Sequence, residues 1–330
     1  MTITPALPTP FTTPVANPSV GASGGGPPYI SPGEFLAAPT ALDTTQLIPG
    51  EGQQAQLQAL ADTVSRASAI ADRICMGQDV AAKGASLAAS VSVESAIVPV
   101  VNGALRLVCD YKPIVQVNGI NVGYSMADLQ PVGSAVQQAI QIGRRTIIVP
   151  LIPYVGRDTS ALNPPMSART AGKFAVLWSY VNGWPHMQLA EPITAGATTC
   201  VVGATDGGTG VLGVVPGATQ LTIRDGASTE TFAVSAVTGT TLTSATPFQF
   251  GHSLPQAPDF LPVTALPADI QNAALYLTMF LIKTRGDSSL VLDPLVEPKQ
   301  IQRLQGDQYA DYTVALSNLE PYRVRIKGHN

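Results

Sequence analysis

The sequence is short of charged residues. Asp, Glu, Lys and Arg together make up 12% of its 330 residues, about half the roughly 25% found in typical soluble domains. The net charge is −4, so the chain lacks the basic surface that tight, sequence-blind binding to nucleic acid requires. Hydrophobic residues reach 45%, which excludes disorder of the whole chain. Either the solvent-exposed surface consists largely of uncharged residues, or much of it is covered by partner proteins.

Cysteine and long apolar runs are also scarce. The three cysteines, Cys75, Cys109 and Cys200, are widely spaced and form no CxxC pair, which predicts buried free thiols and neither a disulfide framework nor a zinc site. The N-terminus lacks the basic residues and apolar centre of a signal peptide. The longest apolar run, 273–282, is far short of the roughly 20 residues that span a bilayer. These features predict a soluble protein made in the cytoplasm.

Residues suited to catalysis are few. None of the three histidines, His186, His252 and His329, has a partner at the spacing of a metal site or a catalytic triad. The sequence contains no G-x-S-x-G, P-loop or H-E-x-x-H motif. The glycine-rich stretch 207–210 lacks the Lys and Ser/Thr of a phosphate loop, so we interpret it as an ordinary loop. We therefore expect no enzyme and no catalytic, cofactor-binding or metal-binding residue.

Residues 1–30 differ from the rest of the chain. They are rich in proline and glycine, and no charged residue occurs before Glu34. Such a segment cannot bury a core of its own, and proline favours extended chain. Two interpretations stay open, a disordered tail and an arm that becomes ordered on a partner. In the second, the anchors would be four apolar residues that recur every four positions: Ile3, Leu7, Phe11 and Val15.

Several helices are predicted from capping signals and periodicity. Ser31 and Glu34 form a capping box around Pro32, which predicts a short helix to about residue 38. Residues 53–76 carry an apolar stripe that packs either within the chain or against a neighbouring subunit. A further helix is expected from Pro267 to Lys283, and a last short one over 309–319. The members of the stripe are Leu57, Leu60, Val64, Ala67, Ala71 and Ile74.

The middle of the sequence is dominated by strand patterns. Over 87–184, Asn-Gly pairs at 102–103 and 118–119 separate apolar runs, which predicts two hairpins. Residues 190–251 are nearly free of charge, with strands expected at 199–202, 220–224, 230–237 and 240–243. We interpret this stretch as a compact β-module whose poorly charged edges are open to pairing with another chain.

The predicted fold class is α+β. We expect a helical core with long helices and an antiparallel sheet, an inserted small all-β module and an extended N-terminal arm. The expected divisions are the arm (1–30), the first part of the core (31–189), the β-module (190–251), and the core helix with the C-terminal tail (252–330).

Four segments carry a resemblance to a known family. Residues 30–47 (ISPGEFLAAPTALDTTQL) and 56–75 (QLQALADTVSRASAIADRIC) resemble the opening of phage head-to-tail connector, or adaptor, proteins. Residues 266–286 (LPADIQNAALYLTMFLIKTRG) are similar to a later helix of that family. The stretch 220–252 resembles small β-modules of phage tail and connector proteins. The long proline-rich arm and the inserted module depart from the small helical adaptors.

The resemblance implies a structural protein of the virion neck, made in the host cytoplasm. It implies a homo-oligomeric ring of about twelve subunits, docked on the portal protein at one side and on a tail or stopper protein at the other. DNA would pass through the channel without specific binding, and no membrane is involved. The candidate interface residues are Phe11, Phe35, Leu36, Leu57, Leu60, Val64, Ala67, Ala71, Ile74 and Phe280.

Two other functions stay open. The first is another virion component, such as a minor tail, tail-terminator or capsid-decorating protein, with six or three copies in place of a ring of about twelve. The second is a binding module in which the β-module grips a saccharide or a host surface. Aromatic residues gathered on one face would support that function, and residues 190–251 contain only Phe232, Phe248 and Phe250.

Overall fold

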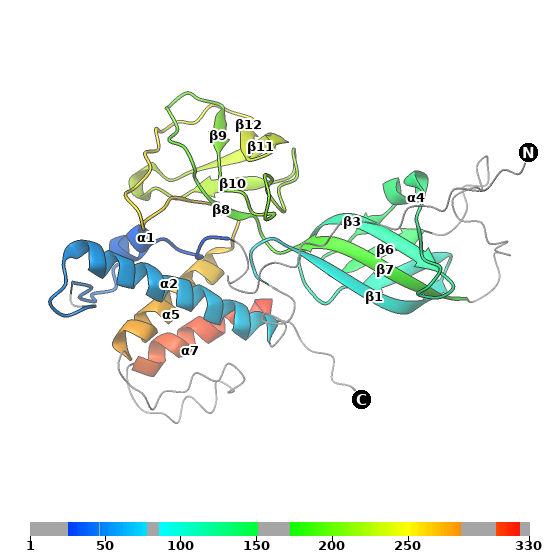
Figure 1. Ribbon diagram of the computed structural model, residues 1–330, viewed down its shortest axis with the longest axis horizontal. Coiled ribbons are helices and arrows are strands. Elements are labelled where there is room, and N and C mark those ends of the chain that lie inside the picture. Colours follow the sequence, from blue (N-terminus) through cyan, green and yellow to red (C-terminus); the bar gives the residue numbers. More distant parts are fainter. Residues whose placement is uncertain (1–25, 46, 78–85, 151–171, 285–307, 324–330) are drawn as a thin grey trace, which may run out of the picture.

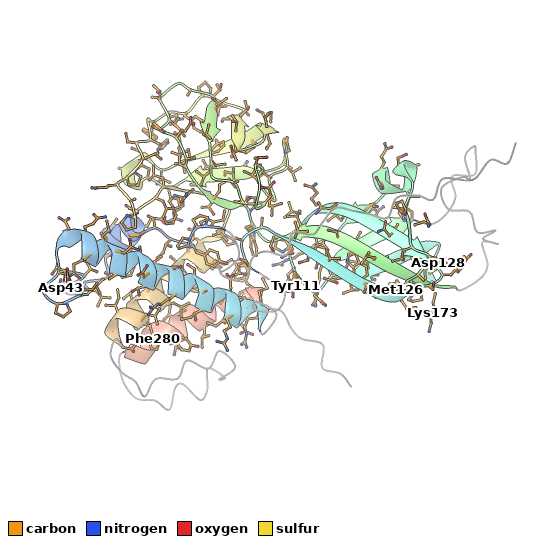
Figure 2. The ribbon with its side chains drawn as sticks, in the orientation of Figure 1. Asp43, Tyr111, Met126, Asp128, Lys173 and Phe280 are labelled. Atoms are coloured by element: carbon orange, nitrogen blue, oxygen red, sulfur yellow. The ribbon has the colours of Figure 1, made fainter. Side chains whose placement is uncertain are left out.

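The computed structural model describes residues 26–45, 47–77, 86–150, 172–284 and 308–323 (Figure 1). These residues form a layer of helices and two separate curled antiparallel sheets. The larger sheet extends sideways from the helices, and the smaller sheet lies above them in the view of Figure 1. Phe280 lies within the helical layer, whereas Met126, Asp128 and Lys173 lie at the far end of the larger sheet (Figure 2).

The helical layer combines the two ends of the described chain. It consists of α1 (Pro32–Ala37), α2 (Gln53–Met76), α5 (Ala268–Lys283) and α7 (Gln308–Leu319), followed by the short 3-10 helix η2 (Glu320–Tyr322). Helix α5 packs against both α2 and α7. The bounds of α2 and α5 agree with the helices predicted from the sequence, and α7 confirms the predicted last helix.

The start of α1 confirms the predicted capping box. The Ser31 hydroxyl accepts from the Glu34 backbone N–H at 3.1 Å, and the Glu34 carboxylate accepts from the Ser31 backbone N–H at 2.7 Å. Tyr29 and Ile30, which fall within the expected arm of residues 1–30, have buried side chains. Helix α1 also joins the smaller sheet, since Asp259 accepts from the Gly33 N–H at 3.0 Å and Arg224 pairs with Glu34.

The larger sheet has seven strands in the order β4-β3-β7-β1-β2-β6-β5, and every pair is antiparallel. Its two longest neighbours, β1 and β7, pair over ten residues each. A short helix, α4 (Ser134–Gln138), lies between β4 and β5. The strands are β1 (Ser90–Val101), β2 (Ala104–Val108), β3 (Ile114–Gly123), β4 (Gln130–Pro131), β5 (Gln141–Ile142), β6 (Thr146–Pro150) and β7 (Lys173–Asn182).

One of the two predicted hairpins is present. Asn102 and Gly103, with φ of 52° and 73°, form the turn between β1 and β2, as the two-residue hairpin requires. The prediction of a hairpin at 118–119 is wrong, because β3 runs through both residues without a turn. The register with β7 shifts between Val117 and Gly119, so Asn118 is the extra residue of a bulge. Pairing with the long strand β7 therefore overrides the local turn preference.

The smaller sheet has six strands in the order β8-β13-β10-β11-β12-β9. Its two outer strands also meet, because the Gly203 N–H donates to the Gln188 carbonyl at 2.8 Å and the Ala190 N–H donates to the Val201 carbonyl at 2.9 Å. The edges that the sequence suggested were open to another chain are thus joined to each other. A 3-10 turn, η1 (Gly226–Ser228), follows β10. The strands are β8 (His186–Gln188), β9 (Thr199–Val201), β10 (Gln220–Ile223), β11 (Glu230–Thr238), β12 (Thr241–Ser244) and β13 (Pro262–Thr264).

The predicted helical core with long helices is wrong. The described residues are mostly two curled antiparallel sheets, and their helical content is 28%, in five α-helices. Only α2, with 24 residues, is long. The prediction failed because helical periodicity is easy to detect, whereas the extent of each sheet depends on pairing between distant strands. The smaller sheet has a hydrophobic core of its own, which includes Leu221, Val234 and Leu242, and two of its strands, β8 and β13, fall outside the expected module.

Candidate interaction surface

The outward face of β1 exposes a row of apolar side chains. Alternate residues of a strand point to opposite faces, and along β1 the exposed positions fall on one of them. The exposed fractions are 46% for Val91, 49% for Val93, 68% for Ile97 and 57% for Val101. Soluble chains rarely leave a continuous apolar surface uncovered unless it serves for contact. This row, called the β1 ridge below, is the candidate interaction surface.

The strands beside the ridge carry no charged residue on the same face, and two of their residues there, Ala175 and Val181, are buried. Residues paired across antiparallel strands share a face, so the register places Ser179 of β7 and Gly119 of β3 beside Val93. Ala175 and Gly123 lie beside Ile97 in the same way. Across β1, β7 and β3 the register places twelve residues on this face, and none of them is charged. They are Val91, Val93, Ser95, Ile97, Ala175, Leu177, Ser179, Val181, Gln116, Gly119, Asn121 and Gly123.

The opposite face of β1 turns its polar residues inward. Ser92 donates to the Asn182 side-chain carbonyl at 2.7 Å, and Glu94 accepts from the Tyr180 hydroxyl and from the Asp110 N–H at 2.9 Å. The alternating pattern of β1 was recognised in the sequence, but the usual rule would place Val91 and Val93 inside. The hydrogen bonds of Ser92 and Glu94 to Asn182 and Tyr180 instead hold the polar residues on the inner face, so Val91 and Val93 lie on the outer face.

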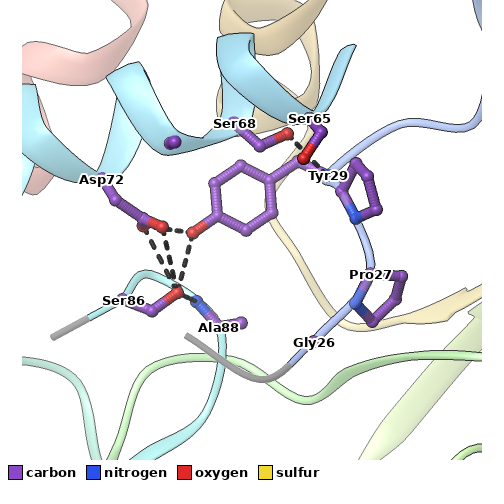
Figure 3. A pocket seen from close by; sticks show the side chains of 10 residues that line it. Gly26, Pro27, Tyr29, Ser65, Ser68, Asp72, Ser86 and Ala88 are labelled. Carbon is purple, nitrogen blue, oxygen red and sulfur yellow. Dashed lines mark hydrogen bonds between the residues drawn. The ribbon is translucent and has the colours of Figure 1, made fainter. Parts of the chain in front are cut away.

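A buried polar cluster holds the beginning of the described chain beside β1 (Figure 3). The Tyr29 hydroxyl donates to the Asp72 carboxylate and lies 3.0 Å from the Ser86 hydroxyl. The Leu87 N–H donates to Asp72 at 2.8 Å. The cavity beside this cluster measures about 30 Å³, room for about one water molecule. The cluster therefore joins three segments, the chain before α1, helix α2 and the approach to β1.

Burial controls the charge of this cluster. It raises the pKa of Asp72 to about 6, against the opposing effect of the hydrogen bonds from Tyr29, Leu87 and Ser86. Burial, followed by the nearby Asp72 charge, raises the pKa of Tyr29 as well. The phenol therefore stays a hydrogen-bond donor at neutral pH, and the arrangement serves as an anchor for the backbone.

His186 is a second anchor for the same segment. Its Nε2 donates to the Pro28 carbonyl at 2.8 Å, which leaves Nδ1 to accept from the Thr264 hydroxyl at 2.9 Å. Burial lowers the pKa of His186 to about 4, so the ring is neutral at physiological pH. Its edge-on contact with the Tyr29 ring, at 5.8 Å between centroids, links the two anchors.

His252 holds together two loops of the smaller sheet. The ring is buried, with Nδ1 3.0 Å from Asp225 and Nε2 2.9 Å from Glu230. Burial raises the pKa of Glu230, but hydrogen bonds from the Gln249 N–H, His252 and the Phe250 N–H outweigh it and the net pKa falls. The sequence alone does not reveal this group, because Asp225, Glu230 and His252 match no known motif spacing. Among the described residues no group of side chains has the geometry of a metal site.

The predicted interface residues are mostly inside the chain. Leu57 is half-buried, Leu36 is 53% exposed, and Phe11 lies outside the described residues. Packing of α2 within the chain therefore accounts for its apolar stripe, and Leu36 is the most accessible described member of the set. The buried members are Phe35, Leu60, Val64, Ala67, Ala71, Ile74 and Phe280.

The three cysteines, Cys75, Cys109 and Cys200, are buried free thiols, as predicted. Burial raises the pKa of Cys109 and Cys200 to about 12. Phe232 and Phe248 are buried against each other with centroids 5.0 Å apart, which leaves no aromatic cluster for a saccharide at these two positions. No helix in the described ranges is long and apolar enough to span a bilayer.

Comparisons with known proteins identify no relative: the chain matches no family model, no curated protein and no solved structure.

Proposed function

We propose that this chain is a structural subunit of a tailed-phage virion, an adaptor in the ring that joins the portal to the tail. In this role the ring surrounds the DNA channel, and its contacts are with neighbouring subunits, the portal and a tail or stopper protein. The proposal is one of assembly, in which surfaces meet and no bond is made or broken.

One observation carries this proposal. The segments 30–47, 56–75 and 266–286, which resemble adaptor proteins, are far apart in the sequence but contain α1, α2 and α5 of a single layer. Helix α2 contacts both α1 and α5 directly. If this chain contained the structural unit of the adaptor family, the segments that resemble that family would be expected to pack together, as these do.

The arrangement of the sheets fits the same proposal. Both curled sheets lie between α2 and α5 in the sequence, so they form one continuous insertion between the resembling helices. The exposed apolar residues of β1, Val93, Ile97 and Val101, add an uncovered apolar row to a chain with only 12% charged residues. Uncovered apolar surface of this kind supports a chain that works in contact with others.

The test is the mass of the purified full chain by light scattering, alone and with the portal protein of the same phage. We expect closed rings of about twelve subunits in at least one condition, seen directly by electron microscopy. A monomer that stays inert in both conditions would contradict an adaptor. A stable trimer or hexamer would favour another virion component, such as a tail terminator or a decorating protein.

A further inference from the structure

We infer that two different surfaces of this chain meet when copies assemble, the Arg106 face of one copy and the Glu191 corner of the next. The Arg106 face consists of exposed residues on β1, β2 and β6: Ile97, Val101, Arg106, Val108 and Ile148. The Glu191 corner consists of exposed residues on two loops of the smaller sheet: Glu191, Phe250 and Leu254. This inference rests on the proposed function, because it specifies the contact between the subunits of the ring.

The Arg106 face continues the β1 ridge across two further strands. The register pairs Val101 with Ala104 and Arg106 with Ile148, so the outward positions of β1, β2 and β6 form one surface. Val108 lies on the same side of β2 as Arg106, because alternate residues of a strand share a face. Among the outward positions of these three strands, Arg106 alone is charged. A guanidinium surrounded by exposed aliphatic side chains is typical of the centre of a protein contact.

A backbone bridge holds the Glu191 corner together. Ile193 and His252 exchange two backbone hydrogen bonds of 2.9 Å in the antiparallel sense. Glu191 and Leu254 therefore lie at the same end of this bridge, and Phe250 lies at its other end. The corner presents a carboxylate together with two exposed apolar side chains, which is the complement of a guanidinium among aliphatic ones.

The two sheets also carry opposite net charge. Residues 86–150 and 172–184, which contain the larger sheet, have five basic and three acidic side chains, whereas residues 185–266 have one basic and five acidic side chains. Within the described residues neither Arg106 nor Glu191 forms an ion pair. Opposite charges favour contact between the two surfaces, and like charges disfavour contact of either surface with its own kind. The chemistry that fits each surface is thus present on a second copy of this chain.

The two surfaces lie on different sides of the subunit. Asp259, five residues after Leu254, accepts from the Gly33 N–H of α1 at 3.0 Å, so the chain that carries the corner leads to α1. Helix α1 lies at the end of the helical layer away from the larger sheet (Figure 1). A contact between two different surfaces leaves one of each kind free in every pair of copies. Further copies therefore add in the same sense until the ring closes.

A charge-exchange experiment tests this contact in the full-length chain, in the condition that gives rings. Arg106→Glu and Glu191→Arg each place like charges at every contact, and we expect each to raise the concentration needed for assembly by about tenfold or more. An equimolar mixture of the two variants should assemble like the wild type, because every contact in an alternating ring then joins one Arg to one Glu. Recovery on mixing also shows that both variants fold. Arg73→Glu, the same change at an exposed position of α2, is the matched control and should assemble like the wild type.

The outcomes separate this contact from the proposed function. If the wild type forms rings and both variants do so at the same concentration, the inference is wrong and the adaptor proposal stands. The same holds if each variant fails alone and mixing restores nothing. Variants that form rings but lose binding to the portal protein would assign the Arg106 face to the portal, which also overturns the inference. A wild type that forms no ring, alone or with the portal protein, would overturn both.

Discussion

The phenol of Tyr29 donates to the carboxylate of Asp72, which lies 43 residues further along the chain on helix α2. Through this bond the segment that precedes the first helix is held to α2. The same carboxylate accepts from the Leu87 N–H, so α2 is also joined to the approach to the larger sheet. The Asp72 side chain therefore connects the segment before α1, helix α2 and the approach to β1. These bonds are directional, so they fix the relative placement of the three segments more narrowly than hydrophobic packing alone.

Replacing Asp72 should destabilise the fold. Asp72→Asn keeps the size of the side chain but leaves a single acceptor for the Tyr29, Ser86 and Leu87 donors. We expect a loss of about 1 to 3 kcal/mol in the free energy of unfolding, measured by urea denaturation. Asp62→Asn, an exposed position of the same helix, is the control and should stay within about 0.5 kcal/mol of the wild type. Equal stability of the two variants would contradict the anchoring role.

The contribution of Asp72 should depend on pH. Its pKa is about 6 in the folded chain against 3.8 for the free side chain, so between these values the folded state binds more protons than the unfolded state. Stability from this group therefore increases as the pH falls from about 6 to about 4. The difference in stability between the wild type and Asp72→Asn should accordingly be larger at pH 4 than at pH 7. A difference that stays constant across this range would show that Asp72 does not titrate as stated.

His186 should show the opposite dependence. Its pKa is about 4 in the folded chain, below the ordinary value of 6.5, so acid favours the unfolded state between these values. His186→Ala should cost about 2 to 4 kcal/mol at pH 7, because it leaves the Pro28 carbonyl and the Thr264 hydroxyl without this buried partner. The cost should shrink as the pH falls from about 6.5 to about 4. Thermal unfolding of both proteins over this range is the measurement.

Gly183 should not tolerate a side chain. Its φ is +91°, and a Cβ would lie 2.6 Å from the Ala88 carbonyl oxygen, a backbone atom that cannot move aside. We expect Gly183→Ala to cost about 2 kcal/mol or more. Gly119→Ala in β3 is the matched control, because a Cβ there meets nothing within 4 Å. If both variants unfold at the same urea concentration, the close approach of the 88 and 183 backbones is not required for stability.

Local signals predicted the local parts of this fold. Ser31 and Glu34 cap α1, the apolar period of α2 gives its length, and Asn102 with Gly103 turns β1 into β2. Each of these depends on residues within a few positions of one another, which is why sequence alone suffices. Strands β9 to β12 of the smaller sheet were found for the same reason, but β8, β13 and the joining of the outer strands were not.

Pairings between distant residues explain what was missed. Asn118-Gly119 is the same dipeptide as Asn102-Gly103, yet it forms a bulge because β7 pairs with β3 on both sides of it. The β1 ridge was overlooked because Asn182 and Tyr180 draw Ser92 and Glu94 to the inner face. The stripe of α2 was considered for both intrachain and intersubunit contact, and only the positions of α5 and α7 show that the chain itself covers it.

The pairing of β8 with β13 affects which insertions and deletions this chain can accept during evolution. Val263 lies opposite Met187, so the polypeptide enters and leaves the smaller sheet through adjacent strands. The distance between the two junctions is thus fixed by one strand pair, whatever lies between them. A lineage can lengthen or shorten the loops between β9 and β12 while the two junctions with the rest of the chain keep their spacing.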